Sequence, residues 1–415
     1  MRGANFIVFL LLARSLALAE FGFYGFLISA LLLVSVACDF GLRQSFAKSI
    51  GQGKITADQA FWHSLAAWLP LTFLAGFLLY MSLQFFPQPE TMTLPLALVL
   101  AMAPPVLFVR IAHGLLLGSG QLGGFNRSEL APRAVLLIGI VALWLIDAIT
   151  LERVLWLLWL SYLSAAAVIL VECRTALTTK PALAWHTLRD LAVTGLGFMV
   201  GIVAMMAFGR SGLIATSTLL DAEASGIYFG IMRLSEMIVE IAMAVGISLF
   251  SHGVRADDNA ASARSLFAVS IAVTSMIALV ALILCLLAQP ILQLVMPEVP
   301  ASAVPAFQLL LAAAVPASLA AMLHPGLASR GLPLLGAAAF ACGLLVMALG
   351  AWVVVPHFGL TGLAALFLGA AIMVAAAQCV IYRKRFKVTL SDAGQTFQTG
   401  FSMILRRLRR ATPQT

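Results

Sequence analysis

The sequence contains few charged residues. Only 10% of its 415 residues are Asp, Glu, Lys or Arg, against about 25% in soluble proteins. A chain with so little charge cannot cover a globule with polar side chains, which excludes a water-soluble multidomain enzyme. It also lacks the alternation of apolar and polar residues that a membrane β-barrel needs. What it has instead is 62% hydrophobic residues and a mean hydropathy of +1.04. These features predict an all-α polytopic membrane protein.

Motifs of catalysis and metal binding are missing as well. The sequence has no Walker A motif, no HExxH and no GxSxG in a strand-turn-helix context. No outer connection is long enough to hold a glycosyl-transfer site. The cysteines stand singly in apolar stretches without a CxxC pair, which is typical of small core residues. We therefore expect neither an enzyme nor a cofactor or metal site. The cysteines are Cys38, Cys173, Cys285, Cys342 and Cys379.

Apolar runs, divided at charged or Gly/Pro-rich breaks, predict about twelve transmembrane helices. The connections between them are short, and the longest outer one is expected from about Arg210 to Ser225. The expected spans are 3–19, 21–43, 61–86, 94–118, 128–147, 152–173, 189–209, 225–250, 263–288, 304–327, 333–355 and 359–382.

The distribution of Lys and Arg predicts the orientation of the chain. With the N-terminus inside, twenty of these residues fall in inner connections and the C-terminal tail, and only Arg14, Arg153 and Arg210 fall outside. This bias predicts that both termini are cytoplasmic. The net charge of +8 is therefore interpreted as a signal of membrane orientation rather than of nucleic-acid binding. Residues 383–415 form a basic tail that we expect to lie on the anionic cytoplasmic leaflet, with a disordered tail as the alternative.

The first apolar run imitates a secretory signal peptide. Arg2 precedes Phe6–Ala13, and Ala17-Leu18-Ala19 has the form of a cleavage site. Against cleavage, Arg14 lies where a signal peptide is uncharged, and removal of this run would contradict the charge bias. We expect the run to be a retained span, and a start recorded too late is the other interpretation of its short length.

A weak internal repeat predicts two halves. Arg14-Ser15 followed by Gly22-Phe23-Tyr24 resembles Arg210-Ser211 followed by Gly226-Ile227-Tyr228, and the end of the fourth span resembles that of the tenth. The repeat predicts two six-helix bundles, 1–178 and 179–382, related by a pseudo-two-fold axis along the membrane normal, with a substrate path between them. Chance matches of Gly and Ser are the alternative.

Several arginines fall at membrane depth or at span ends. An ionised side chain there costs about 2.5–3.5 kcal/mol even on the lenient insertion scale, so each requires a partner or a cavity. A guanidinium suits phosphate, because its planar fork donates two parallel hydrogen bonds. We expect these arginines to line an anion-binding cavity. For Arg14 and Arg210, snorkelling of the side chain to the outer headgroups is an equal alternative. The candidate substrate-binding residues are Arg14, Arg110, Arg210 and Arg233.

Other polar residues in the spans have two interpretations each. Arg233, Glu236 and Glu240 share one helix face, so they form either a self-neutralised polar stripe or a site where Glu236 or Glu240 carries a coupling proton. His113 lies one turn after Arg110, and it either lines the same cavity or packs as a hydrogen-bonded histidine. Asp39 and Arg43, four residues apart, are expected to pair along one helix.

Short motifs along the chain resemble the Wzx-type flippases of O-antigen and exopolysaccharide units, which belong to the multidrug/oligosaccharidyl-lipid/polysaccharide exporter superfamily. Arg14 and Arg210 match arginines in that family's motifs, whereas Arg110, Arg233, Glu236 and Glu240 come from depth alone. The matching motifs are Ala13-Arg14-Ser15-Leu16, Glu20-Phe21-Gly22-Phe23-Tyr24, Asp39-Phe40-Gly41-Leu42, Gly209-Arg210 with Gly226-Ile227-Tyr228, and Phe358-Gly359-Leu360-Thr361-Gly362-Leu363.

The resemblance implies a bacterial inner-membrane transporter of lipopolysaccharide or exopolysaccharide biosynthesis. Such a protein moves undecaprenyl-diphosphate-linked oligosaccharide from the cytoplasmic to the periplasmic leaflet by alternating access, alongside polysaccharide polymerase and chain-length proteins. A cation-coupled multidrug antiporter of the same superfamily is the closest alternative. A membrane polysaccharide polymerase or ligase is disfavoured, because it would need a large outer loop. A non-transporting scaffold would tolerate alanine at the charged positions within the spans.

Overall fold

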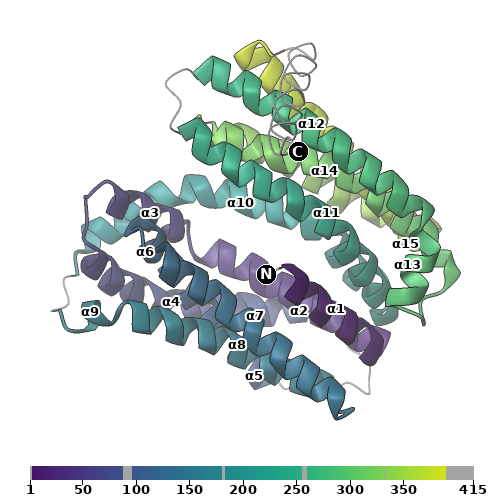
Figure 1. Cartoon of the computed structure of the whole chain (residues 1–415), viewed down its shortest axis with the longest axis horizontal. Coiled ribbons are helices and arrows are strands. Elements are labelled where there is room, and N and C mark those ends of the chain that lie inside the picture. The colour runs from purple at the N-terminus through teal and green to yellow at the C-terminus, as the bar shows by residue number, and fades with distance from the viewer. Residues whose placement is uncertain (1, 87–95, 180–182, 255–258, 331, 389–415) are drawn as a thin grey trace, which may run out of the picture. The chain divides into compact units, whose positions relative to one another are not determined.

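The computed structural model describes residues 2–86, 96–179, 183–254, 259–330 and 332–388 (Figure 1). These residues are almost entirely helical and include no β-strand. From residue 389 onward, the predicted basic tail lies outside the described residues. Arg383, Lys384 and Arg385, which begin the predicted tail, form the last turn of a helix.

The helices have the following bounds: α1 Arg2–Ser15, α2 Leu18–Cys38, α3 Leu42–Gly51, α4 Ala57–Leu83, α5 Leu96–Leu100, α6 Ala103–Gly118, α7 Leu122–Leu145, α8 Leu151–Glu172, α9 Arg174–Leu177, α10 Trp185–Leu219, α11 Ala222–Val254, α12 Asn259–Leu286, α13 Ala288–Val295, the 3₁₀ turn Ala301–Ala303, α14 Val304–Ser329 and α15 Pro333–Phe386.

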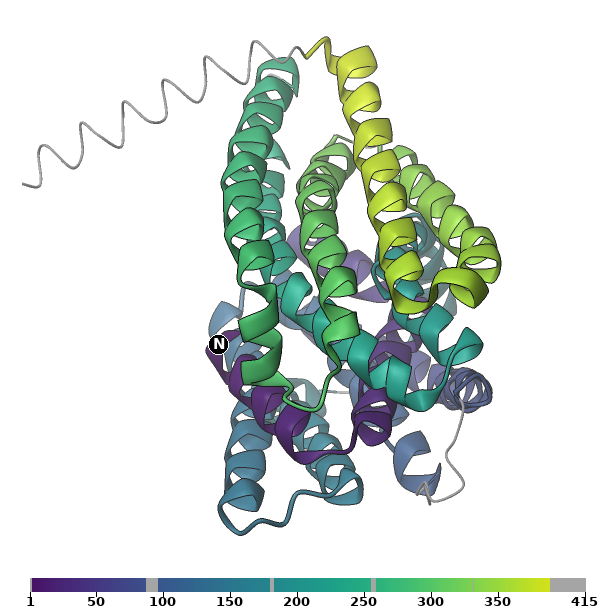
Figure 2. The ribbon, with the colours of Figure 1, turned by 90° about the vertical axis from the view of Figure 1, so that its right-hand side faces the viewer.

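The prediction of about twelve membrane-spanning helices is confirmed. Within the described ranges, nine helical segments are long and apolar enough to cross a bilayer. One of them, α15, is two helices joined at Gly359, whose backbone is not helical (φ 54°, ψ −140°). Figure 2 shows these two halves side by side, in light green and yellow. The remaining two expected spans correspond to α1, which is short, and α11.

The structure differs from the prediction at three places. The second span ends at Cys38, and α3 is a separate helix after a turn. The fourth span, expected as one run from 94 to 118, is interrupted at Ala101–Met102, and Pro104 and Pro105 lie in the first turn of α6, where proline fits. The outer connection expected from Arg210 to Ser225 is mostly helix, because α10 continues to Leu219.

The chain forms two compact units, which we describe separately. The N-terminal unit contains residues 1–230 and 294–298, and the C-terminal unit contains 231–293 and 299–415. In the N-terminal unit, α6 packs against α3, α4 and α8, while α10 packs against α2 and α3. The predicted boundary between the two bundles, at residue 178, was derived from the sequence repeat and not from contacts between helices. It stays a prediction.

In the C-terminal unit, α14 packs against both α12 and α15. One end of this bundle has a core formed by Leu266 and Phe267 of α12, Leu323 of α14 and Tyr382 of α15. Tyr382 is fully buried, and its hydroxyl donates a hydrogen bond to the Leu323 carbonyl oxygen (3.1 Å). A phenol can be buried in this apolar setting because its one strong donor finds an acceptor.

The helix starts support the internal repeat. Gly22 lies four residues after the start of α2 at Leu18, and Gly226 lies four residues after the start of α11 at Ala222. The turns after α6 and α14 also correspond. The Gln121 N–H donates to the Leu116 carbonyl oxygen (2.9 Å), as the Leu332 N–H does to that of Leu327 (3.0 Å).

Candidate functional site

A turn between α2 and α3 begins the polar cluster of the N-terminal unit. Asp39 caps α2, and its Oδ1 accepts a hydrogen bond from the Gly41 N–H (2.7 Å). Phe40 and Gly41 both have positive φ (46° and 69°). A Cβ on Gly41 would lie 2.1 Å from the Gly195 carbonyl oxygen of α10, so only glycine fits at this contact.

Asp39 forms an ion pair with Arg110 of α6. The Arg110 Nε lies 2.5 Å from Asp39 Oδ2, and the side chains are 11% and 1% exposed. Burial raises the pKa of the Asp39 carboxyl, whereas Arg110 and the Gly41 N–H favour the carboxylate and oppose that rise. The expected pairing of Asp39 with Arg43 is wrong. The positive-φ turn interrupts the helix between these residues, so the i, i+4 geometry does not exist.

A second part of the cluster joins α6 to α7. The His113 ring lies with Nε2 3.0 Å from the Ser128 hydroxyl and Nδ1 3.5 Å from Glu129 Oε1. Glu129 also accepts a hydrogen bond from Arg133 at 2.6 Å. His113 is therefore a buried, hydrogen-bonded histidine, as the packing interpretation predicted. Sequence reasoning did not identify Glu129 or Arg133, although their i, i+4 spacing is a recognisable ion-pair signal.

Arg43 is the second residue of α3, a helix that packs against α6 (Figure 1). A Cβ on Gly114 of α6 would lie 2.3 Å from the Arg43 carbonyl oxygen, so the two backbones are in close contact one turn from Arg110. Burial and the Arg110 cation lower the pKa of the Arg43 guanidinium, while Glu129 and Asp39 oppose this. Four charged groups from α3, α6, α7 and the α2–α3 turn thus influence one another.

Arg14 and Arg210 do not occupy equivalent positions. Arg14 is exposed in the last turn of α1, whereas Arg210 lies inside α10, nine residues before its end at Leu219. When the repeat is aligned by the starts of α2 and α11, the counterpart of Arg14 is Thr218, eight residues beyond Arg210, or about 12 Å along the helix. The helix does not end near Arg210 as expected, since it continues to Leu219. A role of either residue in substrate binding stays a prediction.

The C-terminal unit contains the other predicted group, on α11. Arg233 Nη1 lies 3.1 Å from Glu236 Oε2 and 2.9 Å from Glu240 Oε1, and all three side chains are partly buried. The predicted sharing of one helix face is confirmed, since one guanidinium contacts both carboxylates. The geometry suits a neutralised stripe and also a site where one carboxyl gains and loses a proton.

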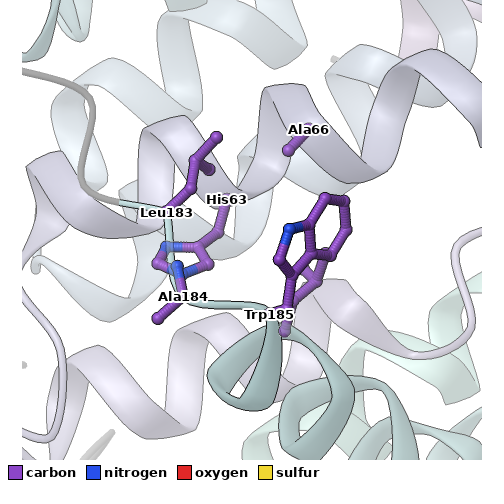
Figure 3. A pocket seen from close by; sticks show the side chains of 6 residues that line it. His63, Ala66, Leu183, Ala184 and Trp185 are labelled. Atoms are coloured by element: carbon purple, nitrogen blue, oxygen red, sulfur yellow. The ribbon is translucent and has the colours of Figure 1, made fainter.

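A small pocket lies near the start of α10. It is lined by His63 and Ala66 of α4 with Leu183, Ala184 and Trp185 (Figure 3). The His63 Nδ1 lies 2.6 Å from the Gln59 carbonyl oxygen, and its Nε2 accepts a hydrogen bond from the Ala184 N–H (3.1 Å). Both ring nitrogens are thus engaged, Nδ1 within α4 and Nε2 with the chain before α10. Within the described ranges, no three His, Cys, Asp or Glu side chains are grouped to hold a metal ion.

No protein-family model and no curated protein sequence matches the chain. Solved structures do resemble it. An inward-facing MATE family multidrug resistance transporter of the MOP superfamily aligns with a TM-score of 0.69 and 15% identity, over 92% of this chain and 94% of that protein. Lipid II flippase MurJ in an inward closed conformation aligns with a TM-score of 0.71 and 12% identity, over 100% of this chain and 92% of that protein.

A third similar structure is a MOP superfamily transporter from Pyrococcus furiosus, described as having a binding pocket of reversed polarity. It aligns with a TM-score of 0.62 and 16% identity, over 89% of this chain and 88% of that protein. At these identities the likeness shows the fold alone. The chain therefore has the fold of MOP superfamily transporters, which confirms the predicted two-bundle helical class.

Proposed function

We propose that the protein is a transporter that moves polyprenyl-diphosphate-linked oligosaccharide from the inner to the outer leaflet of a bacterial inner membrane, with both termini in the cytoplasm. The observation that supports this most is the Arg110 side chain, which lies inside an apolar bundle and, among the residues that the structure describes, donates only its Nε–H, to Asp39. A guanidinium placed in this way retains donors for a phosphate group. The fold is shared with a protein described as a lipid II flippase.

In this proposal Arg14, Arg110, Arg210 and Arg233 bind the diphosphate and acidic sugars. The polyprenyl tail stays in the bilayer and passes beside the bundles. A pathway of this kind requires a polymerase that consumes the exported unit and proteins that control chain length, so we propose both as functional partners.

The test is complementation of a strain that lacks its own flippase. Arg110→Ala and Arg210→Ala should abolish surface polysaccharide while the protein reaches its normal level in the membrane. Arg127→Ala is the matched control, since that side chain is 66% exposed and forms an ion pair with Glu172. Full surface polysaccharide in both test variants would contradict the proposal.

The second candidate function is a cation-coupled multidrug antiporter, which is favoured by Arg233, Glu236 and Glu240 on α11 and by the likeness to MATE transporters. Here Glu236 or Glu240 would bind the coupling proton. Drug efflux by the expressed protein, without restored surface polysaccharide, would favour this candidate. Glycosyltransferase genes beside the gene for this protein would favour the flippase.

A further inference from the structure

Arg110 has hydrogen-bond donors that the protein itself does not satisfy. Its Nε–H is donated to Asp39, whereas neither Nη group has an acceptor among the residues that the structure describes. The side chain is only 11% exposed. A largely buried guanidinium with open donors is costly unless a further acceptor binds there.

Arg43 adds a second guanidinium within electrostatic range of Arg110. In the described part of the chain it has no hydrogen-bond or ion-pair partner, although Asp39, Arg110 and Glu129 all act on its charge. Its backbone is held against Gly114, so α3 cannot move away from α6 without losing a close contact. Arg43 is therefore a positioned cation rather than a surface residue that happens to lie nearby.

The carboxylates of the cluster are already engaged elsewhere. Asp39 accepts from Arg110 and from the Gly41 N–H, and Glu129 accepts from Arg133 while His113 lies beside it. Among the residues that the structure describes, Arg43 therefore has no carboxylate as an ion-pair partner, and the Arg110 cation acts on its charge.

From this geometry we propose that Arg43 and Arg110 together bind a phosphate-containing anion in the N-terminal unit, beside the end of α2, where the start of α3 packs against the middle of α6. Two planar guanidinium forks offer donors to several phosphate oxygens at once, which suits a diphosphate better than a carboxylate. Asp39 is a positioning residue, because it holds the Arg110 Nε and leaves the Nη groups to the ligand. The identity of this anion as the diphosphate of the lipid carrier rests on the proposed function.

The experiment measures binding of inorganic pyrophosphate to the purified full-length protein in neutral detergent by calorimetry. Arg43→Gln should weaken binding at least about tenfold, since charge-assisted hydrogen bonds are lost. Lys48→Gln is the matched control, because it removes the same charge from an exposed position on the same short helix. Its affinity should equal that of the wild-type protein.

Two results overturn the proposal: no pyrophosphate binding by the wild-type protein, or equal binding by wild type and Arg43→Gln. An equal loss in Lys48→Gln also overturns it, because the effect would then be one of net charge. Should Arg43→Gln not fold, Arg43→Lys keeps the charge without the fork and should bind at least about threefold more weakly than wild type. Unchanged affinity in that variant would again overturn the site.

Competition identifies the source of the anion. Undecaprenyl diphosphate in nanodiscs should displace pyrophosphate, whereas phosphatidylglycerol nanodiscs should not. Displacement by both would contradict a site for the carrier. The binding assay requires no transport, so Arg43-dependent binding supports the site even where complementation fails. Conversely, if Arg43→Gln no longer bound pyrophosphate but still restored surface polysaccharide, the ligand of this site would not be the diphosphate of the lipid carrier.

Discussion

Gly22 of α2 lies directly against Gly226 of α11. A Cβ on Gly22 would be 2.6 Å from the Gly226 amide nitrogen, and a Cβ on Gly226 would be 1.9 Å from the Leu18 carbonyl oxygen. These are the two glycines that the internal repeat pairs. The ring of Phe229 fills the next turn of the contact, with its centroid 4.9 Å from that of Phe21. Contact between repeat-related residues is expected near a pseudo-two-fold axis.

This contact predicts that neither glycine can be replaced without moving a helix. Gly226→Ala should lower stability by about 1–3 kcal/mol, the usual range for overpacking, because its nearest neighbour is backbone rather than a flexible side chain. Gly76→Ala in α4 is the control, since nothing lies within 4 Å of its added Cβ. Thermal unfolding in detergent measures both, and equal melting temperatures would show that α2 and α11 can separate without cost.

Breaking the ion pair between Asp39 and Arg110 should be strongly destabilising. Asp39→Asn leaves a largely buried guanidinium without its counter-charge, which typically costs about 3–5 kcal/mol. The double variant Asp39→Asn/Arg110→Gln should lose less than the sum of the single variants, because it leaves neither charge unpaired. A double-mutant cycle on thermal unfolding gives the coupling energy.

Arg127→Gln and Glu172→Gln provide a comparison for that cycle. Their pair has a similar separation of 2.8 Å, but Arg127 is 66% exposed, so the coupling should be below about 1 kcal/mol. Equal coupling for the two pairs would mean that burial of Asp39 does not control the strength of its pairing.

Substitution of the two carboxylates that contact Arg233 tests whether proton movement is coupled to transport. Under proton coupling, Glu236→Gln or Glu240→Gln should flatten the dependence of transport on external pH, because the substituted group no longer binds a proton. Glu223→Gln, at an exposed position in the first turn of α11, should leave the profile unchanged. Profiles that keep the wild-type shape in both test variants would exclude these residues as proton carriers.

Cysteine labelling tests the predicted orientation. Thr150 precedes α8 and Gln121 precedes α7, and both are exposed. In intact cells a membrane-impermeant maleimide should label Thr150→Cys but not Gln121→Cys, and after permeabilisation it should label both. The native cysteines are replaced first to remove background. The reverse pattern would contradict the orientation derived from the distribution of Lys and Arg.

The sequence predicted the helical class and most span positions because both follow from local quantities. A bilayer requires about 20 consecutive apolar residues for each helix, and this requirement is met along the chain independently of tertiary contacts. The shared face of Arg233, Glu236 and Glu240 was predictable for the same reason, since it depends only on helix geometry.

Details that depend on backbone breaks were not predictable in this way. The positive φ at Phe40 and Gly41 separates α2 from α3, whereas the continuous apolar run predicted one helix to residue 43. The same error paired Asp39 with Arg43. The extension of α10 to Leu219 likewise removed the expected equivalence of Arg14 and Arg210.

By itself, the sequence determined that this protein is a helical membrane protein with a few arginines in and beside its spans, because composition and periodicity are set residue by residue. Only the tertiary structure decided which of those charges neutralise one another. Asp39 lies 71 positions from Arg110 in the chain, and no local pattern relates them. Their pairing depends on how α2, α3 and α6 pack, and within the described ranges that packing leaves Arg43 without a hydrogen-bond or ion-pair partner.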